Sequence, residues 1–390
     1  MKIGVVGAGT MGAGIATLAR DAGYACLVYD PDPDARAAVP DAVGRIAELA
    51  GCDLVVEAAP EDLALKRRLF AELAAACGPE TILATNTSSL RVAEIAAETP
   101  NPERVVGMHF FNPPTRMKLV EVVATEDSAE GALDATTHLA EQMGRTPIRA
   151  KDSPGFVANR LARPFSLESL RMLADGVAEP ATIDRVCRLG GGFRMGPFEL
   201  LDLIGLDVNL SVARSFYEQG GQPERWRPSA IQEEMVAAGR LGRKSGQGFY
   251  EYPASPSGAT FARRGHKSRT GTDGVDGVEA PTLDPDELAR IDPVGPEILP
   301  RLVAQIANEA AFALEDAVGS PEDMDKAMRL GFNWPLGPLE LTDLIGTEPA
   351  VALLEELRER HGDAYRPAPG LHNTFSAPQP PVSKSPPTPS

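Results

Sequence analysis

The sequence has few cysteines, few histidines and a deficit of basic residues. Its 390 residues contain four cysteines and five histidines, and 55 Asp and Glu outnumber 38 Lys and Arg, for a formal net charge of −17. A nucleic-acid-binding protein normally presents a basic surface, so the composition argues against nucleic acid as a partner. The cysteines are scattered, at Cys26, Cys52, Cys77 and Cys187. Without paired spacing they favour a reducing cytoplasm over a disulfide framework or a metal site.

A long hydrophobic run is also missing. No stretch approaches the roughly 20 apolar residues that a membrane-spanning helix needs. Residues 1–7 lead directly into a strand-like segment and a glycine turn, where a secretion signal would have a longer apolar core. We therefore expect a cytoplasmic protein without a membrane partner. A chain of this length predicts two or three domains.

A glycine-rich turn follows the first strand-like segment. Residues 3–6 are apolar and residues 13–20 have a helical pattern. Between them stands the pattern G-x-G-x-x-G, formed by Gly7, Ala8, Gly9, Thr10, Met11 and Gly12. In this context the pattern is typical of a dinucleotide-binding loop, in which the first glycine permits the turn, the second admits the pyrophosphate and the third lets the helix pack on the strand. The helix N-terminus would then hold the phosphates.

An acidic residue stands where the second strand of such a fold would end. Residues 26–29 form an apolar, strand-like segment, and Asp30 follows it directly. A carboxylate at this position accepts hydrogen bonds from the adenosine ribose and repels a 2′-phosphate, which favours NAD over NADP. The alternative is that Asp30 only opens the turn that residues 30–33 form.

A histidine and a glutamate stand in two consecutive apolar segments. His109 ends the segment 105–109, and Glu121 interrupts the segment 119–123. Imidazole is the side chain best suited to move a proton near neutral pH, and a carboxylate on its other ring nitrogen would fix its tautomer. The alternative is a buried structural histidine and an exposed strand glutamate.

Three segments resemble the signature of a known family. Residues 109–113 (HFFNP), 117–122 (MKLVEV) and 151–161 (KDSPGFVANRL) closely resemble the L-3-hydroxyacyl-CoA dehydrogenase family, above all its bacterial 3-hydroxybutyryl-CoA and 3-hydroxyadipyl-CoA members with two C-terminal helical domains. The resemblance covers nearly the whole chain. It implies an α/β Rossmann domain followed by two homologous all-α domains of the 6-phosphogluconate-dehydrogenase C-terminal type.

The resemblance also implies an activity and a set of catalytic residues. The enzyme would use NAD to oxidise, reversibly, the L-3-hydroxyacyl thioester of CoA with a short or medium acyl chain. His109 would take the hydroxyl proton, and Glu121 would orient His109 and stabilise its charged form. Ser88 and Asn159 would contact substrate oxygens.

Further residues would serve the cofactor by the same resemblance. Ser88 and Asn112 would lie at the nicotinamide end, and Glu61 and Lys66 match positions near the cofactor. Two alternatives stay open here. Lys66 could be a surface lysine, and the polar group 86–89 could cap a helix N-terminus.

One segment departs from the family. Members usually carry a long helical hairpin between the second and third strands, which helps to bind the CoA nucleotide, whereas a short segment joins Asp30 to Asp53 here. A carrier-protein thioester is therefore an alternative substrate. A gulonate-type sugar-acid dehydrogenase is a second alternative, which the sequence after His109 disfavours. A non-catalytic protein on this fold is a third, and the glycine turn with the His109/Glu121 pair argues against it.

The C-terminal half contains a repeat. Residues 196–205 (GPFELLDLIG) recur 141 positions later as residues 337–346 (GPLELTDLIG), and the same offset relates Arg160 to Arg301 and Glu168 to Glu309. A register held over this length predicts a duplicated helical domain. We expect the second copy to dock on the first as an internal pseudo-dimer, with further oligomerisation left open.

These features divide the chain into five parts. They are a Rossmann domain at 1–152, a first helical domain at 153–252, a flexible linker at 253–296, a second helical domain at 297–371 and a disordered tail at 372–390. The linker and the tail are rich in Pro, Ser and other polar residues, with few apolar positions to bury.

Overall fold

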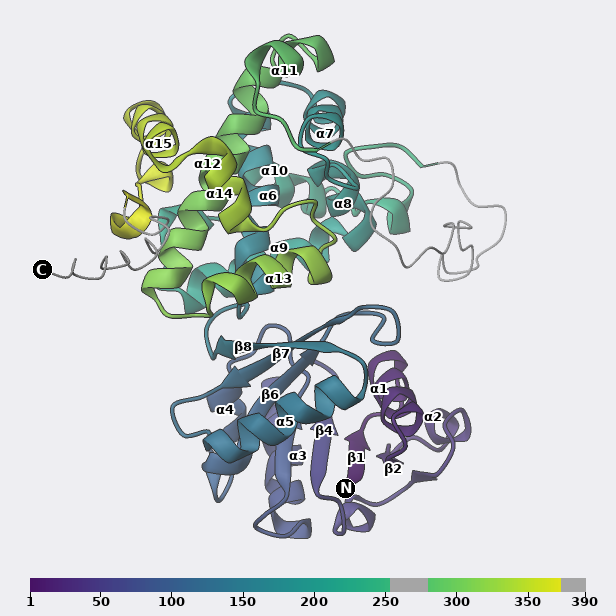
Figure 1. Ribbon diagram of the computed structural model, residues 1–390. Coiled ribbons are helices and arrows are strands. Elements are labelled where there is room, and N and C mark those ends of the chain that lie inside the picture. The colour runs from purple at the N-terminus through teal and green to yellow at the C-terminus, as the bar shows by residue number, and fades with distance from the viewer. Residues whose placement is uncertain (253–279, 373–390) are drawn as a thin grey trace, which may run out of the picture.

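The structure is a computed structural model that describes residues 1–252 and 280–372. It has two lobes, an N-terminal lobe built around a sheet and a C-terminal lobe of helices (Figure 1). Residues 253–279 of the expected linker and residues 373–390 of the expected tail lie outside the described residues. Within the described ranges no helix is long and apolar enough to cross a membrane.

The N-terminal lobe contains an eight-stranded sheet in the order β3-β2-β1-β4-β5-β6-β7-β8. The strands are β1 (Lys2–Val6), β2 (Ala25–Tyr29), β3 (Ala42–Val43), β4 (Leu54–Glu57), β5 (Ile82–Thr85), β6 (Val105–Phe110), β7 (Leu119–Ala124) and β8 (Thr146–Lys151). All neighbours are parallel except β6 and β7. The strand order reverses at β1, so the carboxyl ends of β1 and β4 border the crevice where open α/β sheets bind ligands. The predicted Rossmann fold is confirmed.

Different helices cover the two faces of this sheet. They are α1 (Thr10–Asp21), α2 (Pro33–Ala37), α3 (Leu63–Ala76), α4 (Val92–Ala96) and α5 (Glu130–Gln142). Side chains alternate along a strand, so neighbouring residues of β4 point to opposite faces. Val55 packs in one buried cluster with Phe70 of α3, and Val56 packs in the other with Ile15 of α1 and Leu133 of α5.

The connection from β2 to β4 is short. It holds the five-residue helix α2, the two-residue strand β3 and a 3₁₀ turn, η1 (Ile46–Leu49). The expectation that a long helical hairpin is missing between these strands is confirmed. Ile46 and Leu49 of η1 are buried, so the short connection still covers one edge of the sheet.

The C-terminal lobe consists of ten α-helices in the described residues. They are α6 (Ala158–Ala174), α7 (Pro180–Leu189), α8 (Pro197–Ile204), α9 (Leu206–Gln219), α10 (Ala230–Ala237), α11 (Pro285–Ile291), α12 (Gly295–Glu315), α13 (Pro321–Gly331), α14 (Pro338–Ile345) and α15 (Thr347–His361). Helices α6 to α9 correspond to α12 to α15 at the offset found in the sequence. The predicted succession of two homologous helical regions is confirmed.

The predicted linker is too long at its C-terminal end. Residues 285–291 form α11, and α12 already begins at Gly295. The Asp284 side chain accepts a hydrogen bond from Glu287 N and caps α11. Leu288 is fully buried against Gly190 at the end of α7. The stretch is mostly polar, and its few apolar side chains, including Leu288 and Ile291, pack this short helix against the core.

The two helical copies meet along α6 and α12. The buried Arg160 Nε donates to Glu309 Oε1 over 2.8 Å, and the buried Arg301 Nε donates to Glu168 Oε1. The repeat offset relates Arg160 to Arg301 and Glu168 to Glu309. Exchanging the two copies therefore turns one pair into the other, so the contacts are reciprocal. Pairing matters here because a lone buried charge would be strongly destabilising.

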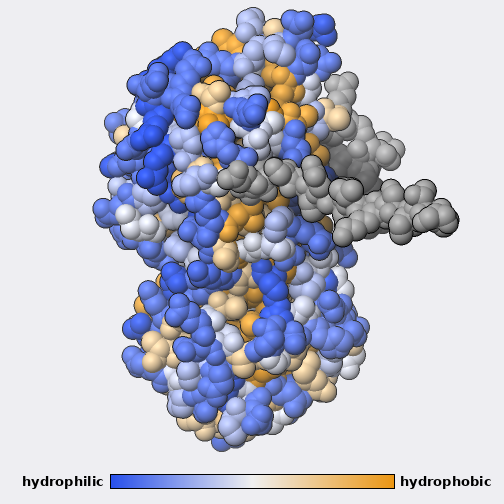
Figure 2. Space-filling model, turned by 60° about the vertical axis from the view of Figure 1, so that its left-hand side comes forward, coloured by the Kyte–Doolittle hydropathy of each residue, from blue (hydrophilic) through white to orange (hydrophobic). Residues whose placement is uncertain are grey.

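The second copy also contacts the N-terminal lobe. Lys151 N at the end of β8 donates to Val318 O over 2.8 Å, just before α13. The Phe332 ring, just after α13, lies 6.2 Å from that of Phe111 between centroids. The surface is mostly hydrophilic and narrows between the two lobes (Figure 2). The second copy therefore packs on both the first copy and the sheet edge.

Candidate active site

The glycine-rich loop has the geometry of a phosphate-binding turn. Gly7 has φ +103°, a conformation that favours glycine. A methyl group on Gly12 would lie 1.9 Å from Gly7 O, so only glycine lets α1 approach β1 so closely. A methyl group on Gly9 would meet nothing within 4 Å. Open space thus lies at the start of α1, where the N–H groups of the first helical turn have no partner within the helix. These residues fit the phosphates of a dinucleotide.

Asp30 lies at the carboxyl end of β2, beside this loop. Its Oδ2 accepts a hydrogen bond of 2.8 Å from Ala8 N, and its Oδ1 accepts one of 2.9 Å from Asp32 N. The alternative turn role is therefore real, and the same carboxylate also fixes the glycine-rich loop. Both contacts place a negative charge next to the expected ribose position.

His109 and Glu121 face each other across β6 and β7. The antiparallel register pairs these two residues directly, and His109 Nδ1 lies 2.6 Å from Glu121 Oε2. Both side chains are almost fully buried, so the alternative of an exposed strand glutamate is wrong. No described residue forms a hydrogen bond with His109 Nε2. The pair can hold one imidazole nitrogen while leaving the other for a substrate.

The second oxygen of Glu121 is bound to the start of α6. Glu121 Oε1 accepts hydrogen bonds from Val157 N at 3.0 Å and Ala158 N at 2.9 Å. The N-terminal end of a helix carries a partial positive charge, so these N–H groups stabilise a negative carboxylate. This contact ties the sheet, the helical lobe and the imidazole together through one side chain.

The two expected asparagines adjoin elements that carry or contact this pair. Asn159 is the second residue of α6 and follows Ala158, as the sequence indicates. Asn112 is exposed, just after β6, and its side chain forms no hydrogen bond with a described residue. The Phe111 and Phe156 rings lie 4.6 Å and 5.8 Å from the His109 ring, between centroids. Apolar rings thus border the imidazole on the side of the helical lobe.

Glu61 collects the polar group that follows β5. Its Oε1 accepts hydrogen bonds from Thr87 Oγ1 at 2.7 Å, Ser88 N at 2.9 Å and Ser89 N at 3.0 Å. Burial alone would raise the pKa of Glu61, but the charge of Lys66 and these hydrogen bonds outweigh it and hold the pKa below its usual value. Ser88 is exposed, so its side chain remains accessible at the mouth of the crevice.

Two alternatives for this region are wrong. Lys66 is 1% exposed, and its Nζ lies 2.7 Å from Glu57 Oε1, because a buried carboxylate draws the lysine into the lobe. The group 86–89 does not cap α4, which begins at Val92. Asp152 takes that role, with its carboxylate accepting from Val92 N at 3.0 Å and Ala93 N at 2.9 Å.

The structure adds the contacts of two polar residues, which the sequence did not predict. Glu57 is fully buried at the end of β4 and accepts hydrogen bonds from Thr85 Oγ1 and Ala59 N. Asn86 Oδ1 accepts from Phe110 N over 2.8 Å and so fixes the chain next to His109. A carboxylate that ends an apolar strand was the available signal for Glu57.

Comparison with protein families matches both lobes. The model of the 3-hydroxyacyl-CoA dehydrogenase NAD-binding domain matches residues 2–46 and 41–153. The model of the 3-hydroxyacyl-CoA dehydrogenase C-terminal domain matches residues 155–252 and again residues 298–384. The first match is split at the short connection between β2 and β4. The second match recurs on both helical copies.

Individual proteins agree with these matches. The chain is 36% identical to 3-hydroxyadipyl-CoA dehydrogenase of Escherichia coli K12, over 94% of this chain and 95% of that protein. It is 42% identical to a probable 3-hydroxybutyryl-CoA dehydrogenase of Bacillus subtilis, over 66% of this chain but 99% of that protein. The crystal structure of 3-hydroxybutyryl-CoA dehydrogenase from Escherichia coli K12 superimposes with a TM-score of 0.81 at 35% identity, covering 96% of this chain and 98% of that one. The chain therefore belongs to the 3-hydroxyacyl-CoA dehydrogenase family.

Proposed function

We propose that the chain catalyses the reversible NAD-dependent oxidation of a short- or medium-chain L-3-hydroxyacyl-CoA, with His109 as the base. The observation that carries this proposal is the 2.6 Å contact between His109 Nδ1 and Glu121 Oε2. Relatives named for 3-hydroxyadipyl-CoA and for 3-hydroxybutyryl-CoA support the thioester and leave the acyl chain open.

The proton moves through His109. The neutral ring donates Nδ1–H to Glu121, and Nε2 accepts the proton of the substrate 3-hydroxyl group. Glu121 then faces an imidazolium, and the N–H groups of Val157 and Ala158 keep the carboxylate in place. A positioned base of this kind contributes about 10²–10⁴ in rate.

The remaining site residues bind and orient. NAD, when bound, accepts the hydride that leaves C3 of the substrate. The glycine-rich loop and Asp30 would hold its adenosine half, with Glu61 and Lys66 supporting the loop after β5. We assign Ser88 and Asn159 to the substrate oxygens, and Asn112 to the nicotinamide end together with Ser88.

The base assignment is tested with His109→Gln. We expect kcat for acetoacetyl-CoA reduction to fall about 10²–10⁴-fold, because no other described group holds an imidazole at this place. NADH affinity should stay within about twofold. His138→Gln on α5, whose side chain is 64% exposed, is the matched control and should keep full activity. Near-normal activity of His109→Gln would show that the base lies elsewhere.

A carrier-protein thioester is the second candidate substrate. The observation that favours it is the short connection between β2 and β4, since α2 has only five residues. Fewer residues are then available to bind the CoA nucleotide. Steady-state kinetics with acetoacetyl-CoA and with the carrier-bound acetoacetyl group separates the two. A micromolar KM for the CoA ester with no advantage of the carrier would remove this candidate.

We further propose that residues 297–371 and 153–250 form an internal pseudo-dimer. The reciprocal pairs Arg160–Glu309 and Arg301–Glu168 support it.

We propose a cytoplasmic location because all four cysteines are buried and unpaired. Burial raises the pKa of Cys26 and Cys52 to about 11, so these thiols stay protonated and unreactive.

A further inference from the structure

Arg163 is a buried cation with no hydrogen-bond or ion-pair partner for its guanidinium among the described residues. It lies on α6, its side chain is 8% exposed, and neither Nε nor Nη1 has a hydrogen-bond partner in the described residues. No carboxylate of those residues lies within ion-pair distance. Burial lowers the pKa of Arg163 to about 10, with no negative charge to offset it. A buried guanidinium normally has a hydrogen-bond or ion-pair partner, so the lack of such a partner at Arg163 requires an explanation.

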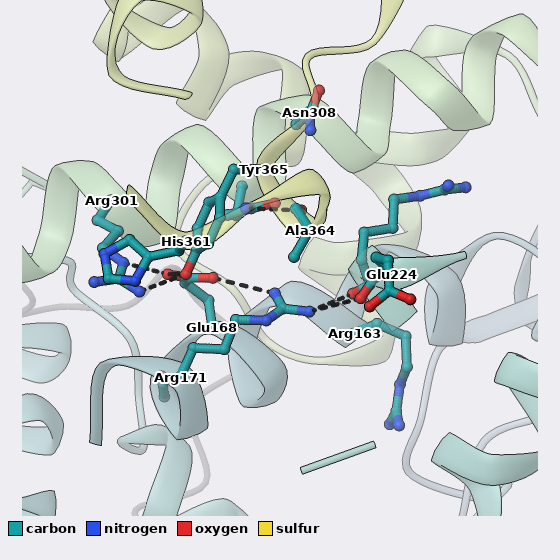
Figure 3. A network of polar contacts seen from close by, with 12 residues as sticks. Arg163, Glu168, Arg171, Glu224, Arg301, Asn308, His361, Ala364 and Tyr365 are labelled. Carbon is teal, nitrogen blue, oxygen red and sulfur yellow. Dashed lines mark hydrogen bonds and ion pairs between the residues drawn. The ribbon is translucent and has the colours of Figure 1, made fainter. Parts of the chain in front are cut away.

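Two other arginines of the helical lobe, Arg171 and Arg301, have acidic partners. Arg171 binds Glu168 and the backbone of Glu224, and Arg301 binds Glu168 and Asp175. Figure 3 shows this network, with Arg163 pointing away from it and no interaction drawn to it. The lobe therefore has acidic groups for its buried arginines, and Arg163 turns elsewhere.

The position of Arg163 on α6 is close to that of Asn159, which the sequence assigns to the substrate. Arg163 follows Asn159 by four residues, so both lie on one face of α6, about 6 Å apart along the axis. Long helical side chains lean toward the helix N-terminus, which here is the end that binds Glu121. The guanidinium lies 5.3 Å from the centre of the Phe216 ring.

Phe216 links this guanidinium to the site. A methyl group on Gly155 would lie 1.7 Å from Phe216 Cζ, so the ring edge packs on Gly155. The next residue, Phe156, contacts His109 with ring centroids 5.8 Å apart. One turn after Phe216 on α9, Gln219 donates to Ser89 O in the loop after β5. Arg163 thus lies against a ring that packs on Gly155, next to Phe156, and α9 also contacts the loop after β5.

Comparison of the two copies distinguishes the residues of α6 that contact α12 from Arg163. Arg160 and Glu168 recur as Arg301 and Glu309, which serve the contact between the copies. Arg163 instead corresponds to Ala304, which is fully buried in the second copy. No catalytic pair lies in front of that copy. The positive charge at this helix position is therefore present only in the copy that adjoins the His109/Glu121 pair.

We propose that Arg163 binds a carboxylate at the far end of the acyl chain, so that the substrate is a 3-hydroxy dicarboxylic acyl thioester. The guanidinium supplies two N–H donors in the fork geometry that suits a carboxylate. The inference rests on the proposed dehydrogenase function and narrows its substrate class. A CoA phosphate is the other anion available. The bulky nucleotide would need an open surface, whereas Arg163 is buried and suits the narrow end of an acyl chain better.

The test compares two substrates of equal chain length. 3-Hydroxyadipyl-CoA carries the terminal carboxylate, and 3-hydroxyhexanoyl-CoA lacks it. We expect the unmodified enzyme to prefer the dicarboxylic substrate in kcat/KM. Arg163→Met should lower kcat/KM for 3-hydroxyadipyl-CoA about 100-fold, as loss of one partner of a buried charge pair does, and leave 3-hydroxyhexanoyl-CoA unchanged or improved. Arg163→Lys should retain part of the preference.

Each contrary outcome has its own meaning. An equal loss with both substrates overturns the proposal, because it indicates a CoA phosphate or a structural role, and weaker NADH binding indicates a cofactor contact. Arg194→Met, which removes an exposed arginine of the same lobe, controls for lost charge. If Arg163→Met does not fold, a preference of the unmodified enzyme for the uncharged chain still refutes the proposal. Failure to oxidise either substrate would refute the dehydrogenase function instead.

Discussion

At the scale of single residues, Asp30 has a structural role beside its proposed role in cofactor recognition. Its two oxygens accept from Ala8 N and Asp32 N, so the carboxylate orders the loop and lies beside the expected ribose. A substitution of Asp30 should therefore weaken the recognition of NADH and the order of the glycine-rich loop at the same time. A change at this residue affects NADH more than a simple loss of a ribose contact would suggest.

We predict that Asp30→Asn narrows the preference for NADH over NADPH. The amide removes the charge that repels a 2′-phosphate and can accept only one of the two backbone hydrogen bonds well. The gap in kcat/KM should shrink at least tenfold, mainly because NADH is used less well. Asp32→Asn removes one charge from the same turn and is the control, which should keep the preference. Equal use of both cofactors by the unmodified enzyme would contradict the role of Asp30.

The residues that the sequence indicated correctly depend mostly on local geometry. Gly7 and Gly12 serve a turn between adjacent elements, so a short pattern is sufficient to predict them. Glu121 was predicted as a partner of His109, but its contact with Val157 and Ala158 joins segments 36 residues apart. Such a contact depends on how the two lobes pack, and no local pattern encodes it.

At the scale of elements, the repeat uses the same helix cap twice. Asp184 of α7 accepts from Phe198 N and Glu199 N at the start of α8. Its equivalent in the second copy, Asp325, accepts from Leu339 N at the start of α14. Glu199 itself accepts a hydrogen bond from Gly196 N, so it also takes part in the cap of α8.

These caps predict a pH dependence of stability. Burial raises the pKa of Asp184 and of Asp325 from 3.8 to about 6. Between these values the folded state binds more protons than the unfolded chain, so the free energy of unfolding should fall as the pH rises from about 4 to about 6. Asp184→Asn should remove about half of this slope in urea titrations, and Asp325→Asn the other half. An unchanged slope in both variants would contradict the prediction.

Element boundaries were less predictable than element types. The strands of the sheet and the repeated helices follow hydrophobic patterns that are visible in the chain. Helix α11 does not, because its docking depends on the few apolar side chains Leu288 and Ile291 and on Gly190 far along the chain. Lys66 was ambiguous for the same reason, since only the buried Glu57 explains its burial.

At the scale of the whole molecule, the two helical copies make reciprocal contacts, which support the proposed internal pseudo-dimer. The B. subtilis relative aligns over 99% of its length with only 66% of this chain, so a relative of about one helical copy exists. The pairs Arg160–Glu309 and Arg301–Glu168 exchange under the repeat offset. A chain with one copy would hold Arg160 without its carboxylate partners and Glu168 with Arg171 as its remaining ion-pair partner, on an apolar helix face.

We predict that truncation after Tyr252 produces a dimer. Removal of α12 exposes the apolar face of α6 together with its two charges, and two such faces are self-complementary. Arg160 of one subunit would then pair with Glu168 of the other, in place of Glu309 and Arg301. Light scattering coupled to size exclusion should give twice the mass of the truncated chain.

Charge reversal makes this last prediction specific. In the truncated chain, Arg160→Glu places two carboxylates against each other and should yield monomer or aggregate. The double change Arg160→Glu with Glu168→Arg restores opposite charges and should recover the dimer. In the full-length chain Arg160→Glu should instead destabilise the fold, because Glu309 is buried next to the new carboxylate. A truncated chain that is monomeric, soluble and fully active would show that the second copy does not complete the helical core.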